Sequence, residues 1–222
     1  MAGGEMNGYS VLNRASREKI YVMRHGDTAL DSTHRSDGWL DLPLSDEGRQ
    51  GVVETLSDFL KFVPITCIYC APFKRTKETA EILKSGIVSD PHIEISPEAK
   101  TWNLGSLAGD PKQPNKAVVR DLIANPEKKA PDGESYDEFT GRFDKWLRKQ
   151  EKESKTEGPL LLVLSGSNCR RISECLMNDR AALDIDTSGL FVMYPDEKGK
   201  WTADLIDGHR DLDDLTDDPE NS

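Results

Sequence analysis

The stretch that decides the fold is residues 19–28, which read Lys-Ile-Tyr-Val-Met-Arg-His-Gly-Asp-Thr. Its first half, Lys19–Met23, is apolar, β-branched and aromatic enough to predict a buried strand. A histidine at the carboxyl end of a central strand lies where open α/β sheets bind their ligands. Arg24 offers a planar fork that suits phosphate oxygens, and Gly26 lets the backbone come close to a ligand. The stretch therefore favours His25 as a nucleophile toward a phosphoryl group.

Four further segments accompany this stretch. The triplet at residues 24–26 alone would also fit a core histidine that is hydrogen-bonded at a strand end, so these segments decide the interpretation. They are residues 38–48 (Gly-Trp-Leu-Asp-Leu-Pro-Leu-Ser-Asp-Glu-Gly), 71–80 (Ala-Pro-Phe-Lys-Arg-Thr-Lys-Glu-Thr-Ala), 102–109 (Trp-Asn-Leu-Gly-Ser-Leu-Ala-Gly) and 133–135 (Gly-Glu-Ser). In this order and at this spacing they resemble the histidine phosphatase superfamily, also called the phosphoglycerate-mutase-like family. The resemblance covers about residues 19–206, which is most of the chain.

The resemblance implies an α/β fold with three layers, α/β/α, around a mostly parallel central sheet. A length of 222 residues suits one such domain, and the hydrophobic pattern alternates between strand and helix. We expect strands at residues 19–23, 66–70, 92–95, 160–164, 189–194 and 201–206. We expect helices at residues 75–83 and 169–177, in a short piece at 118–124, after the cap residue Ser45 with apolar positions Val52, Val53, Leu56, Phe59 and Leu60, and along the stripe Tyr136, Phe139, Phe143, Trp146 and Leu147.

The composition divides the chain into a disordered lead (residues 1–18), one domain (residues 19–207) and an acidic tail (residues 208–222). Within the domain, residues 96–133 are broken by prolines and are expected to form a lid. The formal net charge is −11, and residues 204–222 hold eight acids and one arginine, which is −7 of that total. No basic patch interleaved with aromatic residues is present, so we expect no nucleic-acid binding. No apolar run approaches the ~18–20 residues of a membrane helix, and the lead has no apolar core, so we expect a cytoplasmic protein without membrane attachment.

The cysteines do not predict a metal site. Cys67 and Cys70 are three residues apart on an expected strand, so their side chains point to opposite faces and cannot share an ion. No second Cys-x-x-Cys pair and no histidine nearby in the sequence complete four ligands. We therefore expect reduced core thiols, no metal and no cofactor.

The resemblance gives each motif a role in phosphoryl transfer. His25 is the expected nucleophile, attacking phosphorus from one ring nitrogen while the other nitrogen donates to a backbone carbonyl. Arg24 and Arg75 are expected to hold the equatorial oxygens, which two arginines can do without a metal. Further phosphate-binding groups are expected at Thr28, Ser165, Gly166, Ser167 and Asn168. Candidate proton donors or substrate contacts are Thr101 and Glu134.

Two positions depart from the family's pattern. The family places a second histidine just after the strand at residues 160–164, where this chain reads Ser-Gly-Ser-Asn. The position falls on Gly166 in an alignment without gaps, or on Ser165 if Arg170 is taken as the family's trailing arginine. Many members also carry a glutamate where Thr101 stands.

These observations predict a phosphoric monoester hydrolase that works through a phosphohistidine on His25 and is impaired by the missing histidine. The alternative is a phosphoryl-binding pseudoenzyme that acts as a sensor or scaffold. A phosphoglycerate mutase is disfavoured, because the lid insert with consecutive prolines of those enzymes is absent from residues 84–133. The expected partner is a small phosphorylated molecule, and the lid cations suit a polyanionic or sugar phosphate: Lys100, Lys112, Lys116 and Arg120. The oligomeric state cannot be read from the sequence.

Overall fold

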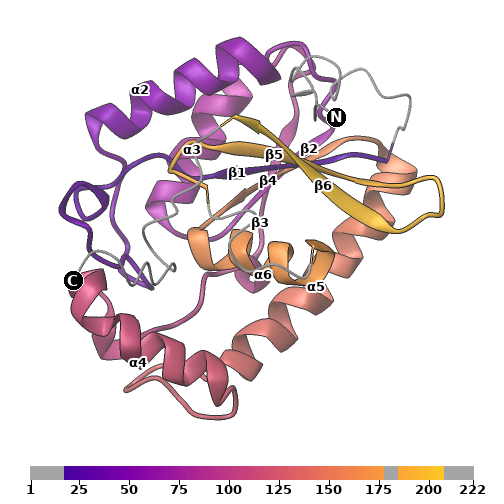
Figure 1. Ribbon diagram of the computed structural model, residues 1–222. Helices are drawn as coiled ribbons and strands as arrows, with labels where there is room; N and C mark the ends of the chain where they lie inside the picture. The colour runs from indigo at the N-terminus through magenta and orange to yellow at the C-terminus, as the bar shows by residue number, and fades with distance from the viewer. Residues whose placement is uncertain (1–17, 178–184, 208–222) are drawn as a thin grey trace, which may run out of the picture.

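The computed structural model describes residues 18–177 and 185–207, and a six-stranded sheet runs through their centre (Figure 1). The strand order is β3-β2-β4-β1-β5-β6. The strands are β1 (Ile20–Arg24), β2 (Cys67–Cys70), β3 (His92–Ile95), β4 (Leu160–Leu164), β5 (Leu190–Pro195) and β6 (Trp201–Asp207). The pairs from β3 to β1 are parallel, whereas β5 is antiparallel to both β1 and β6. The mostly parallel sheet is confirmed; the expected lead, up to residue 17, and the acidic tail lie outside the described residues.

Helices cover both faces of this sheet, which confirms the three layers (Figure 1). They are α2 (Asp46–Thr55), continued by a π-helical turn η2 (Leu56–Leu60), α3 (Lys74–Gly86), α4 (Lys112–Ala124), α5 (Tyr136–Glu157) and α6 (Gly166–Met177). Side chains of α2 and α3 pack with Tyr21 and Met23 of β1. Those of α5 and α6 pack with Ile20 and Val22 on the other face, because successive strand residues point to opposite sides. Within the described residues, no helix is both long and apolar enough to cross a membrane.

The aromatic stripe of α5 lies in the core, as the sequence predicts. The helix begins at a capping box, in which Ser135 Oγ accepts from the Glu138 amide at 3.1 Å and the Glu138 carboxylate accepts from the Ser135 amide at 2.9 Å. Phe139 and Phe143 have ring centroids 5.8 Å apart, and Phe143 and Trp146 follow at 5.7 Å. Offset rings at this separation pack favourably. The stripe thereby fixes α5 against the sheet.

Three helical expectations are wrong in detail. Val53 is 41% exposed, because the buried row of α2 runs through Val52 and Leu56, one position away around the helix. Helix α4 has 13 residues and is not a short piece. Pro114 does not prevent this, since it lies in the first turn, where the amide has no intrahelical acceptor. Helix α6 begins earlier than expected, at Gly166.

Three of the four cysteines are buried, as the sequence predicts, and one is not. Cys67 and Cys70 belong to core clusters on opposite faces of the sheet. Cys169 is also buried. Cys175 is exposed, so the prediction that all four thiols lie in the core is wrong at that residue.

Replacing Phe143 with alanine should lower the free energy of unfolding by about 3–5 kcal/mol, because it removes a fully buried ring from the stripe. Urea unfolding followed by circular dichroism measures the loss. The matched control is Lys145→Ala at an exposed position of the same helix, which should change stability by less than about 0.5 kcal/mol. Equal stability of the two variants would contradict the packing role of the stripe.

Candidate active site

A cavity of about 450 Å³ opens at the carboxyl ends of β1 and β4. Its floor is formed by Arg24, His25 and Arg75, and by the turn at residues 165–167 that leads from β4 into α6. Helix α4 forms the wall on the far side. The cavity therefore occupies the edge at which open α/β sheets bind ligands.

His25 presents a neutral nitrogen to this cavity. Its Nδ1 is 2.8 Å from the Gly26 carbonyl oxygen, which can only accept, so Nδ1 carries the proton. Its Nε2 is 3.2 Å from Arg75 Nε, which can only donate, so Nε2 carries the lone pair. Burial first, and then the charge of Arg75, lowers the pKa of His25 to about 3. The ring is thus a neutral imidazole with Nε2 available for attack.

Gly26 is required by close packing of the backbone. A Cβ at this position would come within 2.5 Å of the Gly48 carbonyl oxygen, at the start of α2. The Gly26 amide donates to Thr79 Oγ1 of α3 at 3.2 Å. The glycine thus lets the segment after β1 approach two helices, and these contacts hold His25 in place.

Arg75 is fully buried at the start of α3 and connects His25 to a loop. Besides its Nε contact, it donates Nη1 to the Leu40 carbonyl at 2.7 Å and Nη2 to the Gly38 carbonyl at 2.8 Å. Its guanidinium also lies over the Phe73 ring, 4.6 Å from the centroid. The side chain therefore orders the loop that forms one wall of the cavity.

Arg24 has one donor without an acceptor. Its Nη1 donates to the Ile185 carbonyl at 2.7 Å, and its Nη2 lies 3.6 Å from Asp31 Oδ1. Its Nε is buried and has no hydrogen-bond partner. An unsatisfied buried N–H of a charged group is costly, so Arg24 Nε is a donor available to an acceptor that could reach it.

Two carboxylates that the sequence reasoning missed lie beside these cations. Asp31 lines the cavity next to Arg24, and Asp37 Oδ2 is 3.5 Å from Arg75 Nε and 3.8 Å from His25 Nε2. The only sequence signal is their place in the loop that follows His25 directly. The two arginines and two aspartates cancel in formal charge.

Thr28 joins the two carboxylates. Its Oγ1 is 3.0 Å from Asp31 Oδ2 and 2.9 Å from Asp37 Oδ1, yet a hydroxyl has a single proton to donate. Burial, followed by the charge of Asp31, raises the pKa of Asp37. Against the effect of burial, the charge of Arg24 and the hydrogen bonds from Thr28 lower the pKa of Asp31. Asp37 is thus the carboxyl that accepts a proton first, and both contacts of Thr28 are then satisfied.

The other predicted site residues divide into two groups. Thr101, Ser165, Gly166 and Ser167 line the cavity with His25, Arg24 and Arg75. The cavity lining does not include Thr28, Asn168 or Glu134. Asn168 donates to the Ala99 and Lys100 carbonyls, and the Glu134 carboxylate binds Arg142 Nη2 at 2.6 Å and the Asn103 amide at 2.8 Å. These residues position loops around the cavity without reaching into it.

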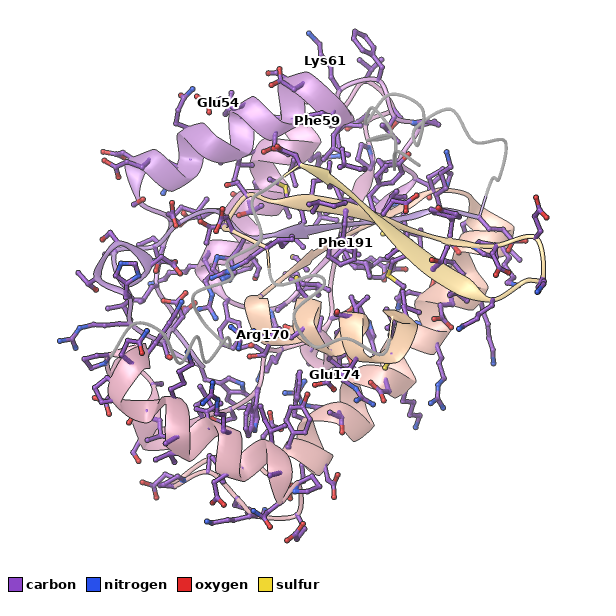
Figure 2. All side chains as sticks on the ribbon, in the orientation of Figure 1. Glu54, Phe59, Lys61, Arg170, Glu174 and Phe191 are labelled. Atoms are coloured by element: carbon purple, nitrogen blue, oxygen red, sulfur yellow. The ribbon has the colours of Figure 1, made fainter. Side chains whose placement is uncertain are left out.

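The far wall combines charge with an apolar surface. Lys112, Lys116 and Arg120 recur every four residues of α4 and all line the cavity, as do Val119 and Ile123. Lys100 does not line the cavity, and its ammonium lies 4.2 Å from the centre of the Trp39 ring. Figure 2 shows Arg170 and Glu174 on the side of α6 that faces α4, and both line the cavity.

A metal ion at the floor of the cavity would be repelled by the two guanidinium groups beside it. His25, Asp31 and Asp37 bring their ligand atoms within 4.8 Å of one another. However, Arg75 already donates to His25 Nε2, and Arg24 lies beside Asp31. Among the described residues that line the cavity, His25 is the one histidine.

Comparisons with known proteins identify relatives of this chain. The sequence profile of the histidine phosphatase superfamily (branch 1) matches residues 20–203. The "Probable phosphoglycerate mutase GpmB" of Cronobacter sakazakii is 28% identical over 130 residues, which is 56% of this chain and 59% of that protein. The protein of the same name from Escherichia coli O1:K1 is 27% identical over 150 residues, which is 65% of this chain and 68% of that protein.

Two solved structures share the fold. Phosphoglycerate mutase from Bacillus anthracis superposes with a TM-score of 0.71 at 22% identity, covering 85% of this chain and 92% of that one. A mycobacterial glucosyl-3-phosphoglycerate phosphatase, solved with VO3, superposes with a TM-score of 0.66 at 19% identity, covering 86% of this chain and 100% of that one. At these identities the likeness concerns the fold.

Anion binding at the floor should depend on pH through Asp37. An ionised Asp37 repels an oxyanion, so binding raises its pKa further and takes up a proton; affinity therefore rises as pH falls. Tungstate at micromolar concentration is a suitable probe, because it stays a monomeric dianion from about pH 8 to about pH 6, so that the pH dependence reports on the protein. Calorimetry should show that Asp37→Asn binds tungstate at least about tenfold more tightly at about pH 8 and loses most of the pH dependence.

The matched control is Asp110→Asn, which removes the same charge from an exposed position that does not line the cavity. It should leave the affinity and its pH dependence unchanged. If Asp37→Asn behaves like this control, Asp37 does not face the bound anion.

Proposed function

Since the chain belongs to the histidine phosphatase superfamily, we propose that it is a phosphoric monoester hydrolase that forms a phosphohistidine on His25. The observation that carries the proposal is the pairing of two atoms at the cavity floor. One is the neutral His25 Nε2, and the other is the buried Arg24 Nε, which has no acceptor. A phosphoryl group at the floor would offer its phosphorus to Nε2 and an acceptor oxygen to Arg24 Nε, and Arg75 Nε would move from Nε2 to a phosphoryl oxygen.

The first step of the proposed reaction is attack by the Nε2 lone pair on phosphorus. The N–P bond forms, the ester P–O bond breaks, and the departing oxygen takes a proton from solvent. The Gly26 carbonyl accepts from Nδ1–H and so stabilises the positive charge that develops on the ring. Arg24 Nε and Arg75 Nε neutralise the phosphoryl oxygens, which is the main demand of phosphoryl transfer. Water then attacks phosphorus, the N–P bond breaks, and inorganic phosphate leaves.

Two features of the site argue for slow turnover. At the floor the two carboxylates offset the two guanidiniums, so the groups beside His25 give a phosphate dianion little net positive charge until Asp37 is protonated. In addition, the turn at residues 165–167 supplies hydroxyls and a glycine where the family resemblance calls for a second histidine. A hydrogen-bond donor held against the oxygens of the transferring phosphoryl group typically raises the rate about a hundred- to a thousandfold.

The same two features favour the second candidate function, a phosphoryl-binding pseudoenzyme that serves as a sensor or scaffold. Such a protein needs the cavity and its arginines, but it does not need a donor for the hydrolytic step. The two functions therefore differ in turnover and not in binding.

Restoring the second histidine separates the two functions. A Cβ at Gly166 would have the Arg24 guanidinium as its nearest neighbour, at 3.6 Å, so a side chain fits there beside the cavity. Gly166→His should raise turnover of an aryl phosphate by roughly two to three orders of magnitude. Ser165→His is the second choice, and Gly166→Ala controls for filling the space without a donor.

His25→Ala is the negative control. We expect this variant to fold like the unaltered chain and to hydrolyse the ester no faster than the uncatalysed reaction. If His25→Ala hydrolyses the ester as fast as the unaltered chain, His25 is not the nucleophile. If the unaltered chain and both histidine variants bind tungstate but hydrolyse nothing, the pseudoenzyme function holds.

For the substrate, we propose a phosphomonoester with a second anionic group and an apolar portion. The phosphate would lie at His25, the second anion against Lys112 and Lys116, and the apolar portion along Val119 and Ile123. The volume of about 450 Å³ exceeds what inorganic phosphate needs and suits a small organic molecule.

The double variant Lys112→Ala/Lys116→Ala tests this substrate class. It should raise KM for a phosphomonoester that carries a carboxylate by about tenfold or more, while KM for an aryl phosphate without a second anionic group stays the same, because only the former contacts α4. The control is Lys145→Ala/Lys149→Ala on the exposed side of α5, which removes equal charge away from the cavity. An equal change in KM for both substrates would contradict the proposal.

A further inference from the structure

One edge of the sheet brings together three side chains that the proposed function does not use. Cys67 opens β2, and its register partner on the parallel strand β3 is His92. Glu94 lies two residues further along β3 and therefore on the same face as His92. One ligand atom from each of these three side chains lies within 4.8 Å of the other two.

From this juxtaposition we propose that Cys67, His92 and Glu94 bind a divalent ion of the zinc class. Thiolate sulfur, imidazole nitrogen and carboxylate oxygen are the three donor types that Zn²⁺ takes in proteins. With bonds of about 2.0–2.3 Å, tetrahedral ligand atoms lie about 3.3–3.8 Å apart, so the present arrangement needs to close by roughly 1 Å.

The surroundings allow this closure and give access to the ion. The side chains of His92 and Glu94 are 65% and 52% exposed, and they can rotate toward the sulfur. They already approach each other, since His92 Nε2 is 3.5 Å from Glu94 Oε1. β3 is the last strand on its side of the sheet, so an ion can reach the site from solvent.

The charge around the thiol also favours a cation. Cys67 is only 3% exposed, and the negative charges of Glu94 and Glu153 act on its thiol. Tyr69, the next residue of β2 on this face, donates its hydroxyl to Glu153. A metal would displace the thiol proton to solvent, and the ion, the thiolate and the Glu94 carboxylate would then sum to zero charge. Water would complete the coordination.

This site is distinct from the Cys-x-x-Cys pair and from the cavity. Cys70 faces the opposite core cluster and cannot take part. The group of His25, Asp31 and Asp37 contains no sulfur, and two guanidiniums lie beside it. A probe that detects metal–sulfur bonds therefore distinguishes the sheet edge from the cavity.

Cobalt(II) titration of the full chain, with its thiols reduced, tests the proposal. Cobalt bound to a thiolate gives a charge-transfer band in the near ultraviolet, and tetrahedral coordination intensifies its visible bands. We expect one equivalent of cobalt to produce both signals and zinc to displace it. Cys67→Ser should abolish the charge-transfer band. His92→Ala and Glu94→Gln should each weaken affinity at least about tenfold, since losing even an outer-shell partner costs about 10–100-fold.

Cys70→Ser and Cys175→Ser are matched thiol controls, and His25→Ala controls for the cavity; all three should keep the band. Circular dichroism reports whether Cys67→Ser is folded, and if it is not, the two exposed ligand variants decide. The proposal is overturned if the full chain gives no band, if folded Cys67→Ser keeps it, if the band is lost in Cys175→Ser, or if His92→Ala and Glu94→Gln both bind cobalt at full affinity.

Discussion

The candidate site depends on one buried guanidinium. Arg75 uses its Nη atoms to hold the Gly38 and Leu40 carbonyls and its Nε to face His25 Nε2. Because a guanidinium is a rigid planar fork, the loop and the imidazole cannot shift independently of each other. The same contact fixes the chemistry of the ring, since a donor opposite Nε2 requires the lone pair to be there and the proton to be on Nδ1. Position and tautomer of the proposed nucleophile thus have a common origin.

Charge balance is the second constraint. A floor with two arginines alone would be costly to bury, and Asp31 and Asp37 reduce that cost in the unliganded protein. They also compete with any anion that enters. Thr28 links the two carboxyls, so a proton taken up by Asp37 would change the hydrogen bonding of both. Under the proposed function, the anion would therefore arrive at the site together with a proton, whether it is then hydrolysed or retained.

The sequence predicts the sheet well and the site only in part. Strands such as Leu160–Leu164 are apolar throughout and can be read from local pattern, as can the stripe through Phe143. Asp31 and Asp37 cannot, because a loop acid is usually solvated, and only the fold turns these two inward. Asn168 and Glu134 show the converse. Both belong to motifs from which the sequence predicts site residues, but their polar atoms form hydrogen bonds with neighbouring backbone groups. Likewise His92 meets Cys67 only through strand pairing, which sequence spacing does not reveal.

The ionisation state of His25 tests the central claim most directly. A long-range proton–nitrogen NMR correlation distinguishes a protonated ring nitrogen from one that bears a lone pair, and His25→Gln identifies the signals. The account predicts a neutral ring with its proton on Nδ1 throughout about pH 5 to about pH 8, since burial lowers the pKa of His25 to about 3. A ring that is protonated at about pH 6, or that carries its proton on Nε2, would contradict the account, because neither form has a lone pair facing the cavity.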